Sequence, residues 1–175
     1  ATTLASIRTQ MSGAMGFDPP SLEAAAAWCL RNEVNYDEAF NWIVSATDPN
    51  LGGRNSFTAL STKSRLLSKL NRQAEADEAM RLGLENASAQ EMHLYGRELL
   101  TEKKTKEAFA VFEKNFKKNK GAWPTHVGMM RGYSALGDLK KALEHARLAL
   151  AQAPNEVNKQ SLEQAIKTLE SGKPL

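Results

Sequence analysis

The stretch SALGDLKKALEHARLALAQAPN, residues 134–155, contains the pattern from which the fold of this chain can be predicted. It opens with a polar turn at Gly137 and Asp138, continues with leucine and alanine at three- and four-residue spacing, and stops at Pro154. Such spacing between two breaks is typical of an amphipathic helix that packs one face against a neighbour. Whether it is a single helix or one part of a repeat depends on the rest of the chain.

The turn-and-alanine pattern returns at a nearly constant interval. An alanine preceded by a polar turn occurs at four positions separated by 37, 32 and 34 residues, namely Ala39, Ala76, Ala108 and Ala142. Ala79 could replace Ala76 as the second of these anchor alanines, but Ala76 keeps Asn71 aligned with Gly137, so we choose it. Mostly small residues stand seven positions after the anchors, at Ala46, Gly83, Asn115 and Ala149. Residues 134–155 are therefore expected to be part of the fourth unit of a repeat.

The remaining sequence is helical in character. Apolar residues recur at three- and four-residue spacing almost throughout, and no stretch shows sustained alternation of β-branched residues. Breaks rich in glycine, proline and asparagine divide the chain into pairs of helices. Apolar stripes over residues 3–15 and 156–170 predict a capping helix at each end. The sequence thus predicts an all-α fold with ten helices.

Together these positions resemble the tetratricopeptide repeat (TPR), whose unit of about 34 residues is helix, turn, helix. The fourth unit carries the resemblance best, through Met129, Tyr133, Gly137, Asp138, Ala142, Ala149 and Pro154. The resemblance implies a single domain, a right-handed superhelical α-solenoid of about four repeats. Its expected parts are a capping helix in residues 1–19, repeats in 20–56, 57–88, 89–122 and 123–154, and a capping helix in 155–175. His126, Met130 and the third unit's turn depart from the family pattern.

A narrower resemblance rests on AAAAWCLRNEVNYDEAFNWI, residues 24–43, followed by FTALSTKSRLLSKLNR, residues 57–72. These stretches are similar to the helical C-terminal tail of certain bacterial proteins whose β-rich upstream domain has unknown function. The resemblance implies an extracytoplasmic, periplasmic location, with the cytoplasm as the alternative. Since the chain begins at Ala1 without a basic and apolar leader, we expect any leader or upstream domain to have been removed.

In TPR arrays, the outward-facing residues of the first helix of each unit line a concave groove. Eleven positions before the four anchors stand Trp28, Arg65, Arg97 and Arg131, and the same helical stripe adds Arg31, Lys69 and His93. The sequence therefore predicts a basic groove with three arginines in register. Arginine binds carboxylate and phosphate groups with paired hydrogen bonds, so an acidic peptide, a carboxylate terminus or a phosphate group is the expected ligand. The alternative is that these arginines are solvated or pair with glutamates such as Glu98 and Glu102.

These features favour a non-enzymatic scaffold that binds a protein or peptide through the basic groove and needs no cofactor. Ala24 and Trp28 occupy positions where the carboxylate-clamp subfamily, which grips chaperone tails, has lysine and asparagine, so that ligand is disfavoured. The alternative function is a structural appendage that mediates self-association or docks a missing upstream domain. Monomer and homodimer both stay open.

The sequence lacks the residue patterns that characterise several other classes of protein. Cys29 has no histidine near it in sequence and is expected to be buried and structural, while the three histidines lack zinc-ligand spacing. A catalytic acid–base pair is missing, so neither a catalytic nor a metal site is predicted. A net charge of +3 disfavours a dedicated nucleic-acid binder, and the basic run at 114–120 suits the end of a helix. No run approaches the roughly 18 apolar residues of a membrane span.

Overall fold

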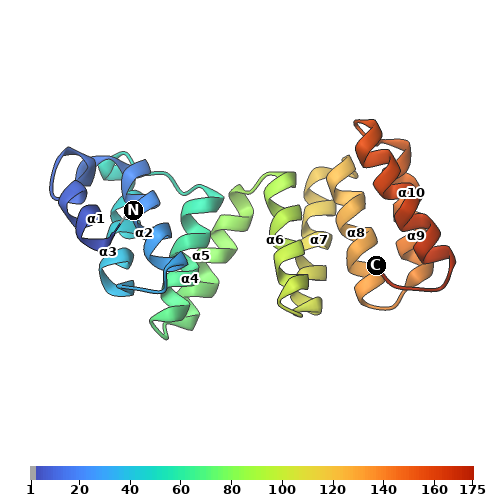
Figure 1. The fold of residues 1–175 in the computed structure, drawn as a ribbon, viewed down its shortest axis with the longest axis horizontal. Coiled ribbons are helices and arrows are strands. Elements are labelled where there is room, and N and C mark those ends of the chain that lie inside the picture. Colours follow the sequence, from blue (N-terminus) through green and yellow to red (C-terminus); the bar gives the residue numbers. More distant parts are fainter. Residues whose placement is uncertain (1–2) are drawn as a thin grey trace. The chain divides into compact units, whose positions relative to one another are not determined.

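The computed structural model describes residues 3–175, which form ten α-helices and no strand (Figure 1). The helices are α1 (Leu4–Met11), α2 (Pro19–Arg31), α3 (Tyr36–Ala46), α4 (Phe57–Lys69), α5 (Gln73–Asn86), α6 (Ala89–Thr101), α7 (Thr105–Asn119), α8 (Trp123–Ala135), α9 (Leu139–Ala151) and α10 (Glu156–Glu170), with 3₁₀ turns η1 (Ala14–Phe17) and η2 (Pro49–Leu51). The predicted all-α helical repeat is confirmed, and the hand of its superhelix stays a prediction. As predicted, no helix in this range is long and apolar enough to cross a membrane.

The chain divides into two compact units where the sequence predicts one array. Unit 1 is Ala1–Ala87 and holds α1 to α5, and unit 2 is Ser88–Leu175 and holds α6 to α10. The boundary lies one residue before the predicted end of the second repeat at residue 88. Within each unit, each first helix packs on the second helix of its own repeat, and the two first helices also touch each other, α2 with α4 and α6 with α8.

Fully buried alanines hold the helix pairs together. The four anchor alanines have no exposed surface, and the residues seven positions later are also buried: Ala46, Gly83, Asn115 and Ala149. A methyl group or hydrogen at these points lets two helix backbones approach closely while larger neighbours fill the gaps beside them. Asn115, the one polar member, donates from Nδ2 to the Ala89 carbonyl at 2.8 Å and so ties α7 to the start of α6. The anchor register predicted from sequence is therefore the packing register.

Each helix hairpin turns through a residue with left-handed backbone. Asn71, Lys103 and Gly137 occupy the same place in three hairpins, with φ of 59°, 62° and 82°. After each of them, a backbone N–H bonds back to the carbonyl five residues earlier, as Arg72 does to Leu67 at 2.9 Å. This is a Schellman helix end, and it confirms the alignment of Asn71 with Gly137. The first hairpin is one residue longer and has two left-handed residues, Glu33 and Asn35.

Phe112 of α7 fills the centre of unit 2 and has no exposed surface. Three glycines on the flanking helices, Gly96 of α6 and Gly128 and Gly132 of α8, make room for its ring. A Cβ added at Gly128 would lie 2.6 Å from Cδ1 of Phe112. Because this contact draws α6 and α8 toward the same ring, it also fixes how the outward faces of these two helices lie beside each other.

The two capping helices were predicted with different success. Helix α10 has the predicted bounds and buries Leu162 and Leu169 against unit 2. Helix α1 ends at Met11, short of the predicted Met15, because Ser12 and Gly13 break it and the chain continues as the 3₁₀ turn η1.

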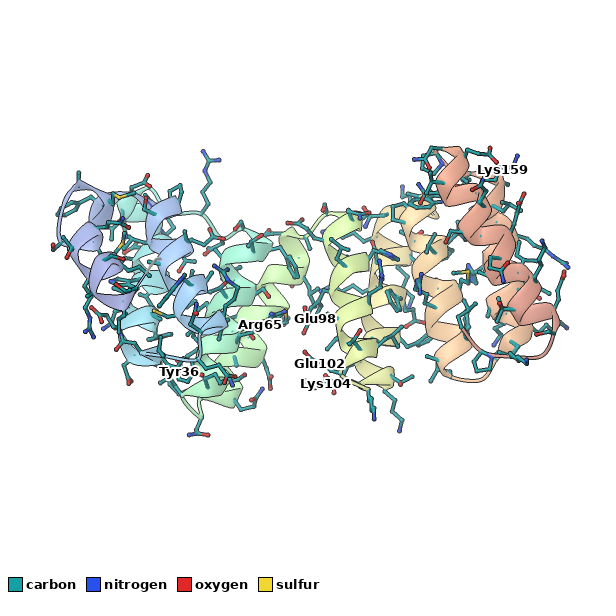
Figure 2. The ribbon with its side chains drawn as sticks, viewed as in Figure 1. Tyr36, Arg65, Glu98, Glu102, Lys104 and Lys159 are labelled. Atoms are coloured by element: carbon teal, nitrogen blue, oxygen red, sulfur yellow. The ribbon has the colours of Figure 1, made fainter. Side chains whose placement is uncertain are left out.

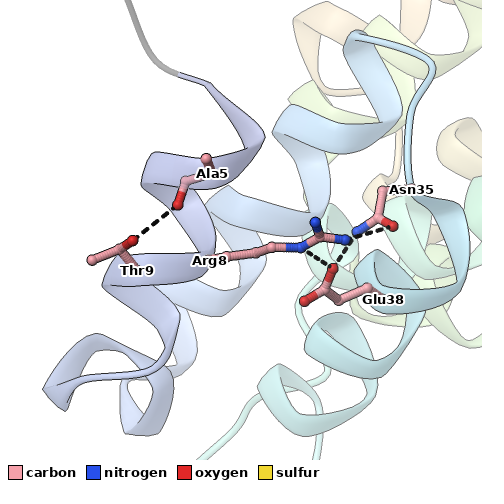
Figure 3. Close-up of polar contacts among 5 residues, drawn as sticks. All are labelled: Ala5, Arg8, Thr9, Asn35 and Glu38. Atoms are coloured by element: carbon pink, nitrogen blue, oxygen red, sulfur yellow. Dashed lines mark hydrogen bonds and ion pairs between the residues drawn. The ribbon is translucent and has the colours of Figure 1, made fainter.

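A polar cluster connects α1 to the first hairpin. The Arg8 guanidinium of α1 pairs with the Glu38 carboxylate of α3 at 2.8 Å and also donates to Asn35 in the turn (Figure 3). Asn35 in turn donates to Glu38. The Arg8 and Asn35 hydrogen bonds hold the pKa of Glu38 below its usual value, although burial opposes them. Because Arg8 is exposed and Glu38 is partly exposed, we expect this pair to orient α1 more than to stabilise it.

Replacing Lys103 with glycine should stabilise unit 2, because a side chain at φ 62° is strained and glycine is not. We expect a gain of about 0.5 to 1 kcal/mol in the free energy of unfolding, measured by urea denaturation. Asn71→Gly is the matched control, and its gain should be smaller because asparagine tolerates the left-handed region. A loss of stability in Lys103→Gly would contradict this account of the turn.

Gly128→Ala should destabilise unit 2 by about 1 to 3 kcal/mol, because the new Cβ collides with the Phe112 ring. The same substitution in a Phe112→Leu background should be neutral or slightly stabilising, since alanine favours helix over glycine by about 1 kcal/mol. Urea denaturation of the four proteins measures this coupling directly. Additive effects of the two substitutions would show that Gly128 is not a packing position.

Candidate functional site

The seven residues predicted to line a groove fall in both units. Trp28 and Arg31 lie on α2 and Arg65 and Lys69 on α4, whereas His93 and Arg97 lie on α6 and Arg131 on α8. All seven are on first helices of repeats, as the register predicts. Arg65 belongs to unit 1, and Arg97 and Arg131 to unit 2. The register of all three arginines therefore stays a prediction, while the geometry within each unit can be described.

A hollow of about 330 Å³ opens in unit 2 between α6, α8 and α10. We call it the unit 2 hollow, and its lining is His93, Arg97, Trp123, Val127, Met130, Arg131, Asn158, Ser161, Leu162, Ala165 and Leu175. His93 and Arg97 stand one turn apart on α6, and Val127 and Arg131 one turn apart on α8, so each helix presents one stripe to the hollow. The structure thus brings together three of the predicted groove residues in one concave site.

Three buried polar atoms in the lining have no hydrogen-bond partner. They are Nδ1 of His93, Nε1 of Trp123 and Nε of Arg131, and no other orphaned polar atom is found among the buried side chains that the structure describes. A buried polar atom without a partner destabilises a fold by about 1 to 3 kcal/mol, so native structures keep few of them. All three belong to residues around one hollow. Their grouping makes the unit 2 hollow the candidate functional site.

The side chains that line the hollow are positive or neutral. Its lining contains no carboxylate side chain, and neither Arg97 nor Arg131 forms an ion pair with any described residue. Burial lowers the pKa of Arg131, and the charge of Arg97 acts in the same direction. Burial, together with the charges of Arg131 and Arg97, lowers the pKa of His93 to about 4, so its ring is neutral at pH 7. The hollow therefore offers two cations, an indole donor and one imidazole acceptor or donor.

The sequence-based alternative, pairing of the groove arginines with Glu98 or Glu102, does not apply to Glu102. The Glu102 carboxylate pairs with Nζ of Lys104 at 2.8 Å in the turn between α6 and α7 (Figure 2). On the other side of the hairpin, the His93 ring lies near the Phe112 ring, with centroids 6.1 Å apart. The hollow is thus supported from behind by the packed centre of unit 2.

Sequence reasoning missed part of the lining. Trp123 stands one turn before Val127 on the predicted stripe, so extending the stripe by four residues would have found it. Helix α10 was predicted only as a cap, yet its polar Asn158 and Ser161 also face the hollow. Nothing in the sequence pattern points to Leu175, because its position depends on how the segment after α10 folds back.

In unit 1, the predicted residues lie in two places. Trp28 and Arg31 line a mainly apolar hollow of about 280 Å³ with Met11 and Met15. Lys69 lies 3.6 Å from the Glu33 carboxylate and above the Tyr36 ring, whose centroid is 5.8 Å from Nζ. Arg65 is exposed on α4 (Figure 2). The unit 1 residues therefore form no single basic groove comparable to the unit 2 hollow.

Two other histidines form a separate pair behind the hollow. Nδ1 of His126 lies 3.0 Å from Nδ1 of His145, and both rings pack edge-on against Phe116. One ring must be a neutral acceptor for this hydrogen bond to form. Burial lowers the pKa of both, and the proximity of His126 adds to the effect on His145. No group of three potential metal-ligand side chains is present among the described residues.

Cys29 of α2 is fully buried in the core of unit 1, in a cluster with residues of α3 and α4. Burial, with a smaller contribution from Glu38, raises the pKa of its thiol, which disfavours the reactive thiolate. This environment agrees with the structural role expected from sequence.

In comparisons with family models, curated proteins and solved structures, nothing matches this chain.

Lowering the pH should destabilise unit 2 at pH values above those at which carboxylates usually become protonated. The pKa of His93 is about 4 in the folded chain and 6.5 ordinarily, so its neutral form contributes stability above pH 6.5 that is lost as the pH falls toward 4. For His93 this amounts to about 2 kcal/mol between pH 7.5 and pH 5. Urea denaturation at both pH values measures the loss.

His93→Gln is the matched variant for this prediction, because glutamine keeps polar atoms and does not titrate. Its stability should fall by about 2 kcal/mol less than that of the wild type over the same range, the remaining loss coming from His126 and His145. Equal losses in the two proteins would show that His93 is not held neutral by its surroundings.

Proposed function

We propose that this protein is a non-enzymatic TPR-like scaffold domain that binds an anionic segment of a protein or peptide in the unit 2 hollow. The observation that carries the proposal is the group of three unpartnered polar atoms beside two arginines that lack a carboxylate. Unpartnered polar atoms beside two positive charges are energetically unfavourable. An anion can accept hydrogen bonds from the arginine and indole donors at once.

The chemistry of the lining suggests a peptide with an acidic side chain. Arg97 and Arg131 supply charge-assisted hydrogen bonds, and the Trp123 indole supplies a neutral one. Neutral His93 can accept a hydrogen bond at Nδ1, which suits a main-chain amide better than a second anionic oxygen. Val127, Met130 and Leu162 form an apolar floor on which a neighbouring ligand side chain can rest. Charge would set orientation and association rate, and the preformed hollow would limit the entropy lost on binding.

A labelled acidic peptide tests the proposal. We choose a fluorescein-labelled octapeptide of glutamate and leucine, with the same peptide carrying glutamine for glutamate as the uncharged control, and measure fluorescence anisotropy. The full chain should bind the acidic peptide at least 10-fold more tightly than the control peptide. Arg131→Gln should weaken binding at least 10-fold, because it removes a desolvated cation from the lining.

Arg147→Gln is the control variant, since Arg147 is an exposed arginine on α9 that pairs with Glu170 outside the hollow. It removes the same charge and should change the affinity less than 2-fold. Equal losses in Arg131→Gln and Arg147→Gln would indicate only general electrostatic attraction. The Arg65→Gln variant tests separately whether unit 1 contributes to the affinity for the peptide, as the predicted arginine register implies.

A further inference from the structure

The segment after α10 folds back onto the hollow. The helix ends at a left-handed Gly172, with φ of 77°, and the Lys173 N–H bonds back to the Thr168 carbonyl at 3.3 Å. The chain then runs from the end of α10 across to α8 (Figure 1). Its Leu175 lines the unit 2 hollow together with Arg97 and Arg131. The segment therefore already places Leu175 where a ligand is proposed to bind.

One hydrogen bond holds this segment to α8. The main-chain N–H of Leu175 donates to Oγ of Ser134 at 2.8 Å, and Ser134 is almost completely buried. A serine hydroxyl can accept a hydrogen bond from any main-chain amide, so the contact does not depend on the side chain of residue 175. Ser134 of α8 is thus a point beside the hollow at which a main-chain amide is held.

The fit of the segment is incomplete. Leu175 remains 46% exposed, and the three polar atoms of His93, Trp123 and Arg131 keep no partner although the segment lies in the same hollow. Lys173 and Pro174 bring no acceptor side chain to the arginines. A segment that covers the hollow without giving these three atoms hydrogen-bond partners can be displaced by a ligand that does both.

We propose that residues 173–175 act as an internal competitor that occupies the main-chain-binding part of the hollow until an acidic peptide displaces them. The proposal rests on the function proposed above, since it concerns the same hollow. The apparent affinity for a ligand falls in proportion to the fraction of molecules in which the hollow is open. Loss of this segment should therefore strengthen ligand binding without changing the arginine contacts.

The test uses the full chain and a variant that ends at Gly172, which keeps α10 and its glycine cap. Far-ultraviolet circular dichroism verifies that both fold. The labelled acidic peptide should bind the shortened chain roughly 3- to 10-fold more tightly, which corresponds to a hollow that is open in about 10 to 30% of full-length molecules. Val157→Ala, which trims an exposed side chain of α10 outside the hollow, is the control and should leave the affinity unchanged.

A second readout does not depend on the acidic probe. The peptide Ser-Gly-Lys-Pro-Leu, added to the shortened chain, should shift the nuclear magnetic resonance (NMR) signal of the Trp123 indole N–H, and Ser134→Ala should weaken that binding. The full chain should not respond, because its own segment fills the site. Equal affinity of full and shortened chains for the acidic peptide, or no response of the shortened chain to the added peptide, would overturn the inference. Failure of the acidic peptide to bind either chain would reject the proposed function instead.

Discussion

Close approach of helix backbones at buried small residues is the constraint on which both units depend. The four anchor alanines are completely buried, and each lies where a second helix meets the first helix of its repeat. In unit 2, Gly96 and Gly128 extend this principle, since they bring α6 and α8 onto one phenylalanine ring. Once the small residues fix the distance and register of the first helices, their outward stripes must lie side by side. The unit 2 hollow follows from that geometry, because His93, Arg97 and Arg131 stand on those stripes.

Much of this was predictable because packing repeats in sequence. The anchor register, the hairpin turns at Asn71 and Gly137 and the bounds of α10 all follow from spacing and turn chemistry, and the structure has them as predicted. The early end of α1 was missed because its apolar stripe continues to Met15 past the break at Gly13. The repeat pattern itself continues through Ala87 and Ser88, so spacing alone does not mark the point at which the chain divides into two compact units.

The candidate site was predictable only in part, and for a physical reason. A helical stripe places His93, Arg97 and Arg131 on one face, and it could have been extended to Trp123. It cannot show that Nδ1, Nε1 and Nε of three residues are buried without partners, because burial depends on neighbours from α10 and from the segment that returns to Ser134. Those neighbours are what shield these three atoms of the basic stripe from solvent. The unfavourable energy of the orphaned atoms is the feature that a ligand can relieve.

The most direct test of ligand binding in the unit 2 hollow is an NMR comparison of the ¹⁵N-labelled full chain with and without a saturating acidic peptide. The signals to follow are the Trp123 indole N–H and the Arg131 Nε–H. We predict that both shift and become protected from solvent exchange on binding, because each gains a hydrogen-bond partner, while the Nε–H of Arg147 on α9 does not change. Unchanged Trp123 and Arg131 signals at saturation, or equal changes at Arg147, would contradict the assignment of the site.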